Sequence, residues 1–252
     1  MALEVGSNGL QRDAEQFSCT DVPTGRPYRK VRSHSSDLAS RAMNLSNPML
    51  IVGLTGSLAT GKSTVADMLR ELGAKVLDAD KMAHHLMRPG APCFKPIVRS
   101  FGRGILVGGT IDRKKLASVV FKHGSALQKL EEIIHPSVIK KIKAELMRFK
   151  KAGRAKMVVI DAPLLMEAGL HRVADVIVVV KATQSQQIER AAQSMHINRS
   201  EAVRRIRAQM PLKEKVRLSD VVITNTADLD QTRKGVQTVW FKLLKNTNIH
   251  KK

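Results

Sequence analysis

The chain contains 252 residues, of which 43% are hydrophobic but only 3% are aromatic. This length and apolar content allow one domain with a buried core made mainly of aliphatic side chains. The apolar runs fall short of the roughly 20 residues that a membrane-spanning helix needs, which excludes that class of protein. The formal net charge of +21 favours anionic partners such as nucleotides or nucleic acid, but does not choose among them.

The N-terminal residues 1–48 differ in composition from the rest of the chain. They are rich in Ser, Asn, Gly and Arg and lack apolar periodicity, which predicts disorder. A misplaced start codon is the alternative, because Met49 directly precedes the first apolar run, and several acidic residues argue against a transit peptide. Residues 246–252 form a basic tail. The two cysteines, Cys19 and Cys93, suggest neither a disulfide nor a metal site, so we expect a reducing compartment, the cytoplasm.

Five short apolar runs predict the strands of one sheet. Runs rich in Val and Ile are typical of strands covered on both faces, so we expect an α/β fold with a parallel sheet and helices on each side. A helix with Gly73 as its C-terminal cap is expected after the first run. The runs are MLIVGL (49–54), AKVLDAD (74–80), MVVIDAP (157–163), DVIVVV (175–180) and DVVIT (220–224).

Two mainly helical segments interrupt this alternation. The first, residues 82–153, is far longer than a crossover between parallel strands requires, so we expect an inserted helical subdomain. Within it, Pro136 should separate one helix from the next. The second segment, residues 184–212, is helical, charged and rich in arginine, and we expect it to form a small lid.

The stretch GSLATGKS (56–63) matches the phosphate-loop pattern G-x-x-x-x-G-K-[ST]. A predicted strand precedes it and a predicted helix follows it, which is the context that the motif requires. The glycines allow several backbone N–H groups to face one anion, and the helix N-terminus adds partial positive charge. Lys62 should reach the β- and γ-phosphates of ATP, and the Ser63 hydroxyl should bind Mg²⁺. We therefore expect a five-stranded sheet of the P-loop NTPase type.

Acidic residues end two of the predicted strands beside this loop. Ligands of open α/β sheets bind outside the carboxyl ends of the strands. Asp78 and Asp80 could therefore accept a proton from a hydroxyl that attacks the γ-phosphate, although one of them should instead cap the following helix. Asp161 could assist Mg²⁺, or could simply begin a loop before a proline.

Six motifs, named below, occur along the chain in the order expected of the dephospho-CoA kinase family, which the sequence resembles over about residues 49–244. This family uses ATP to phosphorylate the ribose 3′-hydroxyl of dephospho-CoA, the last step of coenzyme A biosynthesis. The combination is more specific than the phosphate loop alone. The motifs are GLTGSLATGKSTVA, VLDADKMAHHLMRPG, IIHPSV, DAPLLMEAGL, RIRAQM and SDVVITN.

The resemblance implies an ATP- and Mg²⁺-dependent kinase domain over residues 49–245 and assigns a role to single residues. The implied catalytic residues are Asp80 as base, Lys62 and Arg190. The implied ATP-binding residues are Gly56, Ala59, Thr60, Gly61, Lys62, Ser63, Thr64 and Asn225. The acceptor would be bound by the subdomain over residues 82–153 together with Asp78, His135, Pro136, Pro163, Leu164 and Leu165, although the residues alone would favour core positions for the two leucines. Ser63 is the implied Mg²⁺ ligand, and Asp161, from its position at the end of a predicted strand, is the candidate second one.

The sequence departs from the family at Ser194, where a second lid arginine is expected. An arginine that stabilises charge in phosphoryl transfer can change the rate by orders of magnitude. The replacement could come from the same segment, which contains Arg199, Arg204, Arg205 and Arg207. The alternatives are a kinase for another nucleoside or nucleotide, or a weakly catalytic nucleotide-binding module. ATP and dephospho-CoA are the expected small-molecule partners, and no membrane is expected. The few aromatic residues argue against nucleic acid, because they offer no platform for its bases.

Overall fold

A computed structural model describes residues 49–120 and 124–248. The expectations for residues 1–48 and 249–252 lie outside the described residues, and residues 246–248 of the expected tail continue the last helix. No helix in these two ranges combines the length and the apolar content that crossing a bilayer demands.

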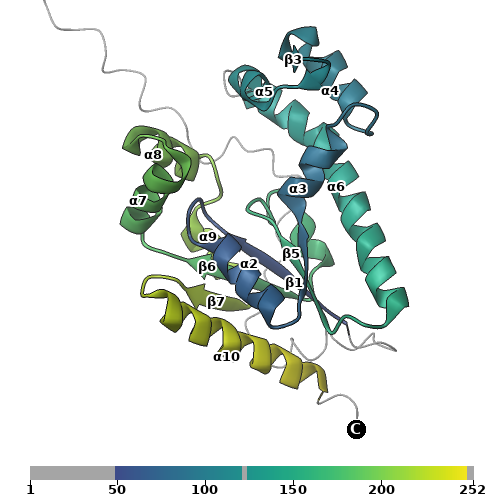
Figure 1. Cartoon of the computed structure of the whole chain (residues 1–252). Coiled ribbons are helices and arrows are strands. Elements are labelled where there is room, and N and C mark those ends of the chain that lie inside the picture. The colour runs from purple at the N-terminus through teal and green to yellow at the C-terminus, as the bar shows by residue number, and fades with distance from the viewer. Residues whose placement is uncertain (1–48, 121–123, 249–252) are drawn as a thin grey trace, which may run out of the picture. The chain divides into compact units, whose positions relative to one another are not determined.

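Five parallel strands form the central sheet, as the sequence predicted (Figure 1). Their order is β2-β5-β1-β6-β7. The middle strand β1 pairs with β5 on one side and with β6 on the other. Register places Leu54 of β1 beside Asp161 of β5, and Asp161 beside Asp78 of β2. The strands are β1 (Leu50–Gly56), β2 (Lys75–Asp78), β5 (Met157–Asp161), β6 (Val176–Lys181) and β7 (Val221–Thr224).

Alternate residues of these strands enter two separate apolar clusters. On β5, Met157 and Val159 join the cluster that contains α2 and α10, whereas Val158 and Ile160 join the cluster that contains α6 and α9. The strands are therefore buried on both faces, which explains their continuous apolar sequences. The covering helices are α2 (Lys62–Glu71), α10 (Leu229–Asn248), α3 (Ala79–Leu86), α6 (Gly124–Ala152) and α9 (Leu212–Arg217).

The helix α2 ends as expected. Gly73, just beyond its C-cap, has a φ of 106°, a value that favours glycine. The prediction for the second strand was partly wrong, because β2 stops at Asp78 and Asp80 already belongs to the first turn of α3. The reason is a local cap: the Asp78 carboxylate accepts a hydrogen bond of 2.8 Å from the Lys81 N–H.

The predicted break at Pro136 is wrong, because α6 runs unbroken from Gly124 to Ala152. A proline inside a helix costs about 3 kcal/mol through its missing N–H and its ring. Apolar contacts on both sides of the proline offset that cost. Before it, Leu130 packs on the cluster around Ile97, and after it Val138 and Ile142 pack against the sheet.

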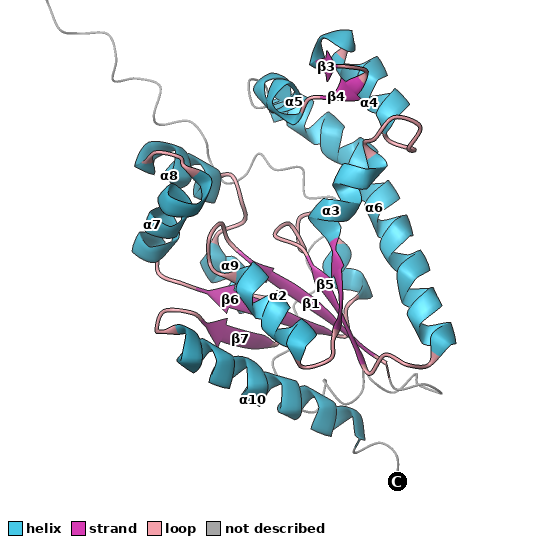
Figure 2. Ribbon diagram, viewed as in Figure 1, coloured by secondary structure: helices cyan, strands magenta, loops and turns pink. Residues whose placement is uncertain are grey.

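Residues 82–153 contain more than helices. Figure 2 shows the short hairpin of β3 and β4 beside α4 and α5, which the sequence did not predict. This region has its own buried cluster, which includes Cys93, Ile97, Ile105, Leu116 and Val120. Its further elements are α4 (Phe94–Phe101), the 3₁₀ helix η1 (Arg103–Ile105), β3 (Leu106–Val107), β4 (Thr110–Ile111) and α5 (Arg113–Val120).

The arginine-rich segment forms two helices, α7 (Gln184–Met195) and α8 (Arg199–Arg207). They separate because His196 adopts the left-handed conformation, with a φ of 52°, at the end of α7. Asn198 then caps α8 by accepting from the Glu201 N–H at 2.8 Å. The remaining 3₁₀ helix, η2 (Leu170–Val173), precedes β6.

The helix α10 offers a test of this packing, because two nearby residues lie on opposite sides of it. Leu243 is 5% exposed and belongs to the core, whereas Phe241 is 65% exposed. We expect Leu243→Ala to lower the free energy of unfolding by about 2–5 kcal/mol. The matched control Phe241→Ala should change it by no more than about 0.5 kcal/mol. Urea unfolding followed by circular dichroism measures both, and equal losses would contradict the assigned face.

Candidate functional site

The phosphate loop turns sharply between β1 and α2. Ala59 and Gly61 have φ values of 55° and 86°, in the left-handed region. The Thr60 hydroxyl donates to the Ser57 carbonyl oxygen at 3.0 Å and holds the turn from inside. Gly56 also needs its hydrogen side chain, because a Cβ there would lie 2.5 Å from the Thr60 hydroxyl oxygen. Such a loop at a helix N-terminus is suited to an anion.

Asn225, just after β7, holds the other side of the loop. Its side-chain N–H donates to the Thr60 carbonyl oxygen at 2.9 Å, and its Oδ1 accepts from the Thr232 hydroxyl at 2.9 Å. The approach is so close that a Cβ on Gly61 would lie 1.9 Å from the Asn225 Nδ2. The Arg190 guanidinium donates to the Asn225 carbonyl oxygen at 3.2 Å. The structure thus brings three of the predicted residues together: Gly61, Arg190 and Asn225.

Gln209, which follows α8, also contacts the loop. Its Oε1 accepts from the Leu58 N–H at 3.0 Å and from the Ser57 hydroxyl at 3.3 Å. Leu58 and Ala59 pack against the small apolar cluster that joins α7 and α8. The segment predicted as a lid therefore touches the phosphate loop through both polar and apolar contacts.

The acidic residues gather around Lys62. Its ammonium group forms an ion pair with Asp161 at the end of β5, and both side chains are largely buried. Asp78 is the register partner of Asp161 on β2, and Asp80 follows one residue after β2. Ser63 and Thr64 lie on the first turn of α2, where the Ser63 side chain is exposed. The sequence-predicted carboxylates and the lysine thus share one site.

Burial and mutual repulsion act on these carboxyl groups. Asp80 stays accessible to solvent, but the surrounding protein desolvates its carboxyl group and raises its pKa, with Lys62 opposing and Asp78 and Asp161 adding to the rise. Burial likewise raises the pKa of Asp161, and the attraction of Lys62 opposes it. A carboxyl group beside an anion-binding loop, with a raised pKa, is suited to accept a proton.

A buried ion pair supports the loop after β5. The Lys215 side chain of α9 is fully buried, pairs with Glu167 at 3.0 Å and donates to the Pro163 carbonyl oxygen at 2.5 Å. The Thr55 hydroxyl donates to the same carbonyl oxygen at 3.1 Å. Glu167 also accepts from the Met210 N–H at 3.1 Å. Burial lowers the pKa of Lys215, and Glu167 counteracts it.

The predicted acceptor residues differ in what they can offer a ligand. Leu165 is fully buried in the core, where it packs so close that a Cβ on Gly53 would lie 2.8 Å from it. Leu164 and Pro163 are half-buried. His135 is also half-buried, and burial lowers its pKa while Glu167 opposes the shift. Pro136 is exposed on α6.

The expected Mg²⁺ ligands fit a metal that is bound through few protein groups. Within the described ranges, no three His, Cys, Asp or Glu side chains form a cluster able to hold a metal ion. Mg²⁺ usually keeps several waters and takes one or two carboxylates plus substrate phosphates. The Ser63 hydroxyl and the Asp161 carboxylate beside the phosphate loop suit that chemistry.

The sheet order, the phosphate loop and the acids at the strand ends define a kinase-like member of the P-loop NTPase class. The family model for dephospho-CoA kinase matches residues 50–231. The chain therefore belongs to the dephospho-CoA kinase family.

Relatives and solved structures agree with this assignment. The chain is 42% identical to dephospho-CoA kinase of Carboxydothermus hydrogenoformans over 75% of this chain and 92% of that one. It is 44% identical to dephospho-CoA kinase of Symbiobacterium thermophilum over 76% of this chain and 80% of that one. It is similar to the crystal structure of TT1252 from Thermus thermophilus, with a TM-score of 0.68, 33% identity and coverage of 79% and 99%. For dephospho-CoA kinase from Campylobacter jejuni the TM-score is 0.59, with 27% identity and coverage of 78% and 98%.

Sequence reasoning missed three residues that shape the site: Gln209, Glu167 and Lys215. Gln209 and Glu167 lie within motifs that carry the family resemblance, RIRAQM and DAPLLMEAGL, so a signal was present. For Lys215 the sequence contains no such signal, because the surrounding residues, LKEKVR, are typical of a solvated helix face.

The buried pair predicts an asymmetric response to substitution. Lys215→Met leaves the Glu167 carboxylate without its cation, so we expect a loss of about 3–5 kcal/mol in the free energy of unfolding. The double variant with Glu167→Gln removes the unpaired charge and should recover part of the loss. Urea unfolding of the two variants and the wild type measures this. A double variant less stable than Lys215→Met would contradict the role of the pair.

Proposed function

We propose that this protein transfers the γ-phosphoryl group of ATP to the ribose 3′-hydroxyl of dephospho-CoA, giving coenzyme A and ADP. The observation that carries the proposal is the position of Asp80 beside Lys62 and the phosphate loop, in a chain of the dephospho-CoA kinase family. The acceptor oxygen forms a bond to the γ-phosphorus while the bond to the ADP oxygen breaks. The hydroxyl proton passes to the Asp80 carboxylate.

The phosphate loop would hold ATP in this reaction. Backbone N–H groups at the turn from the loop into α2 would face the β- and γ-phosphates, and the Lys62 ammonium would neutralise the charge that develops on the transferred group. To do so, Lys62 leaves its ion pair with Asp161. Asn225 keeps the loop in shape through its bond to the Thr60 carbonyl oxygen.

Mg²⁺ would be held by the Ser63 hydroxyl and by Asp161, which the movement of Lys62 sets free. When bound, the ion neutralises phosphate charge and orients the γ-phosphoryl group. Only the deprotonated Asp161 carboxylate can bind the ion. Because the pKa of this carboxyl group is raised, the affinity for Mg²⁺ should fall in acid.

The acceptor would lie between the sheet edge and the subdomain over residues 82–153. Asp78 fixes the start of α3 through its cap, and so positions Asp80. Further surface for the acceptor would come from His135, Pro163 and Leu164. Pro136 is the exposed neighbour of His135. Leu165 is buried and supports the loop after β5 from the core.

Residues 184–212 would act as a lid that closes on ATP and excludes water. Arg190 is held beside the loop, where its guanidinium donates to the Asn225 carbonyl oxygen. Ser194 donates to the Arg190 carbonyl oxygen at 2.6 Å and offers no charge. Arg204 and Arg205 both pair with Glu201, whereas Arg199 and Arg207 have no ion pair among the described residues. Arg199 and Arg207 are therefore the better replacements for the missing arginine.

A reducing compartment such as the cytoplasm would suit this protein. The one cysteine within the described ranges, Cys93, is a buried free thiol. Its side chain lies in the core of the subdomain over residues 82–153, where a disulfide is not formed.

Product formation tests the function directly. We expect ATP, Mg²⁺ and dephospho-CoA to yield coenzyme A, detected by mass spectrometry. Asp80→Asn keeps the shape but cannot take the proton, so kcat should fall by about 10²–10⁴-fold while ATP still binds. Wild-type kcat in this variant would remove Asp80 as the base, and absence of product with the wild type would refute the reaction.

The pH dependence of kcat supplies a second check on Asp80. The base acts only when deprotonated, and its pKa is raised above the ordinary 3.8. Activity should therefore fall as the pH drops through the raised pKa, at a higher pH than an ordinary aspartate would give. The residual activity of Asp80→Asn should lack this acid limb. An acid limb unchanged in the variant would assign it to another group.

The metal requirement depends on Asp161. Asp161→Asn should raise the Mg²⁺ concentration for half-maximal activity by about tenfold or more, because an amide binds Mg²⁺ less well than a carboxylate. Asp67→Asn is the matched control, since Asp67 lies exposed on α2 and pairs only with Arg70 among the described residues. A Mg²⁺ titration of the rate measures both. The same half-maximal concentration in all three proteins would exclude Asp161 as a ligand.

A further inference from the structure

A ring of polar contacts starts and ends at the phosphate loop. It begins at Thr55, directly before the loop, whose hydroxyl donates to the Pro163 carbonyl oxygen at 3.1 Å. The Lys215 ammonium donates to the same carbonyl oxygen at 2.5 Å and pairs with Glu167 at 3.0 Å. Pro163 and Glu167 both belong to the stretch after β5, so these contacts tie the end of β1 to that stretch.

Gln209 closes the ring. The carboxylate oxygen that pairs with the ammonium also accepts from the N–H of Met210 at 3.1 Å. The preceding residue, Gln209, accepts through its Oε1 from the Leu58 N–H at 3.0 Å and from the Ser57 hydroxyl at 3.3 Å. From there the chain itself leads back to Thr55. The members of this polar ring are Thr55, Ser57, Leu58, Pro163, Glu167, Gln209, Met210 and Lys215.

Gln209 is the link of the polar ring that joins the expected lid to the phosphate loop. It lies in the short connection between α8, which belongs to that lid, and α9, which supplies Lys215. The Thr55 and Lys215 side chains are fully buried, whereas Gln209 is half-buried. Hinges are usually a few loop residues that absorb a movement. A movement of α8 would therefore reach Ser57 and Leu58 through the two hydrogen bonds that Gln209 accepts.

The polar ring spans both sides of the proposed reaction. Ser57 and Leu58 belong to the phosphate loop, whereas Pro163 belongs to the surface proposed for the acceptor. Phosphoryl transfer needs the attacking and the leaving oxygen in line with the γ-phosphorus. A misplacement of about 1 Å that is caused far from the chemistry can cost about 100-fold in rate. A contact that sets the position of the loop relative to the acceptor can therefore control the rate without touching either substrate.

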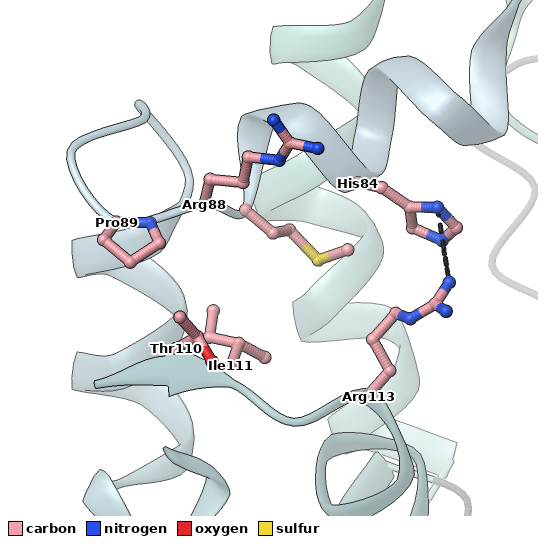
Figure 3. A pocket seen from close by; sticks show the side chains of 7 residues that line it. His84, Arg88, Pro89, Thr110, Ile111 and Arg113 are labelled. Carbon is pink, nitrogen blue, oxygen red and sulfur yellow. Dashed lines mark hydrogen bonds between the residues drawn. The ribbon is translucent and has the colours of Figure 1, made fainter. Parts of the chain in front are cut away.

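The polar ring is separate from the cavity in the subdomain over residues 82–153. This cavity, of about 320 Å³, lies between the end of α3, the β3–β4 hairpin and the start of α5 (Figure 3). Its lining includes His84 and Arg113, which contact each other at 3.0 Å. Among the residues that the structure describes, the lining includes no member of the polar ring. A substitution at Gln209 therefore alters the surroundings of the phosphate loop and leaves the lining of this cavity unchanged.

We infer that Gln209 is a positioning residue for phosphoryl transfer, which fixes the phosphate loop, and with it the γ-phosphorus, relative to the acceptor hydroxyl. This inference rests on the proposed function. When the contact of Gln209 with the loop is lost, the γ-phosphorus leaves its line with the acceptor oxygen, and water attacks instead. The water oxygen then forms a bond to the γ-phosphorus while the bond to the ADP oxygen breaks. A proton is released to solvent, and the products are ADP and inorganic phosphate.

The test compares two substitutions at Gln209 that nearly keep the size of the side chain. Gln209→Met removes the acceptor, whereas Gln209→Glu keeps an oxygen that can accept from Leu58 and Ser57. Gln237→Met is the matched control, because Gln237 is exposed on α10 and lies outside the polar ring. Coenzyme A and ADP are measured in the same reaction of the full chain with ATP, Mg²⁺ and dephospho-CoA. Circular dichroism checks that each variant is folded.

For Gln209→Met, we expect kcat for coenzyme A formation to fall about 10–100-fold, because the reacting atoms lose their alignment. The KM values for ATP and for dephospho-CoA should both change less than kcat. The amount of ADP released should exceed the amount of coenzyme A formed by about twofold or more, because water competes with the misaligned acceptor. The wild type and the control should release equal amounts of ADP and coenzyme A.

Gln209→Glu should show the opposite pattern. Because the accepted hydrogen bonds are retained, kcat and the ratio of ADP to coenzyme A should stay near the wild-type values. The added negative charge beside the phosphate loop should instead raise KM for ATP, and added NaCl should reduce this rise by screening. A purely structural role of Gln209 would not give two side chains of similar size opposite effects on kcat and on KM for ATP.

Wild-type kcat in Gln209→Met would overturn the inference. A fall in kcat with equal amounts of ADP and coenzyme A would overturn it too, and so would equal losses of kcat in the two Gln209 variants. In each of these cases the wild type still makes coenzyme A, so the proposed function stands. If the wild type makes no coenzyme A, the proposed function fails, and the inference with it.

Discussion

The ion pair between Lys62 and Asp161 is the contact on which the arrangement of the site depends. Lys62 begins α2 and Asp161 ends β5, so the pair joins the phosphate loop to the edge of the sheet. Register then places Asp78 beside Asp161, and the cap made by Asp78 sets where α3 and Asp80 begin. Because the pair is largely buried, removing either member leaves an unpaired charge, which is far more costly than at the surface.

Local signals in the sequence were enough for the parts of the fold that depend on neighbouring residues. The phosphate loop, the five strands, Gly73 and the cap by Asp78 all follow from residues within a few positions of one another. The predicted helix break at Pro136 was wrong because the helix through this proline is stabilised by packing against two distant clusters. Lys215 was missed for a related reason: a lysine in a charged helix gives no sign that Glu167 and Pro163 surround it. For the site, the types of residue could be predicted from the sequence. That they lie close together follows from the register of β1, β5 and β2, which the sequence does not show.

The phosphate loop and the segment over residues 184–212 are held together from several directions. Gln209 binds the Leu58 N–H, Asn225 binds the Thr60 carbonyl oxygen, and Leu58 and Ala59 pack on the cluster between α7 and α8. Arg190 reaches the same place through the Asn225 carbonyl oxygen. The shape of the loop is therefore not a property of the motif alone, because segments far along the chain fix it.

The single tryptophan of the chain has a consequence for studying how the protein unfolds. Trp240 is buried in the cluster formed by α2, α10 and one face of the sheet, whereas the cluster around Ile97 belongs to the subdomain over residues 82–153. Intrinsic fluorescence is thus blind to the second cluster, while circular dichroism records the helices of both. Coincident transitions from the two signals would indicate one cooperative unit, and an earlier dichroism transition would mark the subdomain as a separate one.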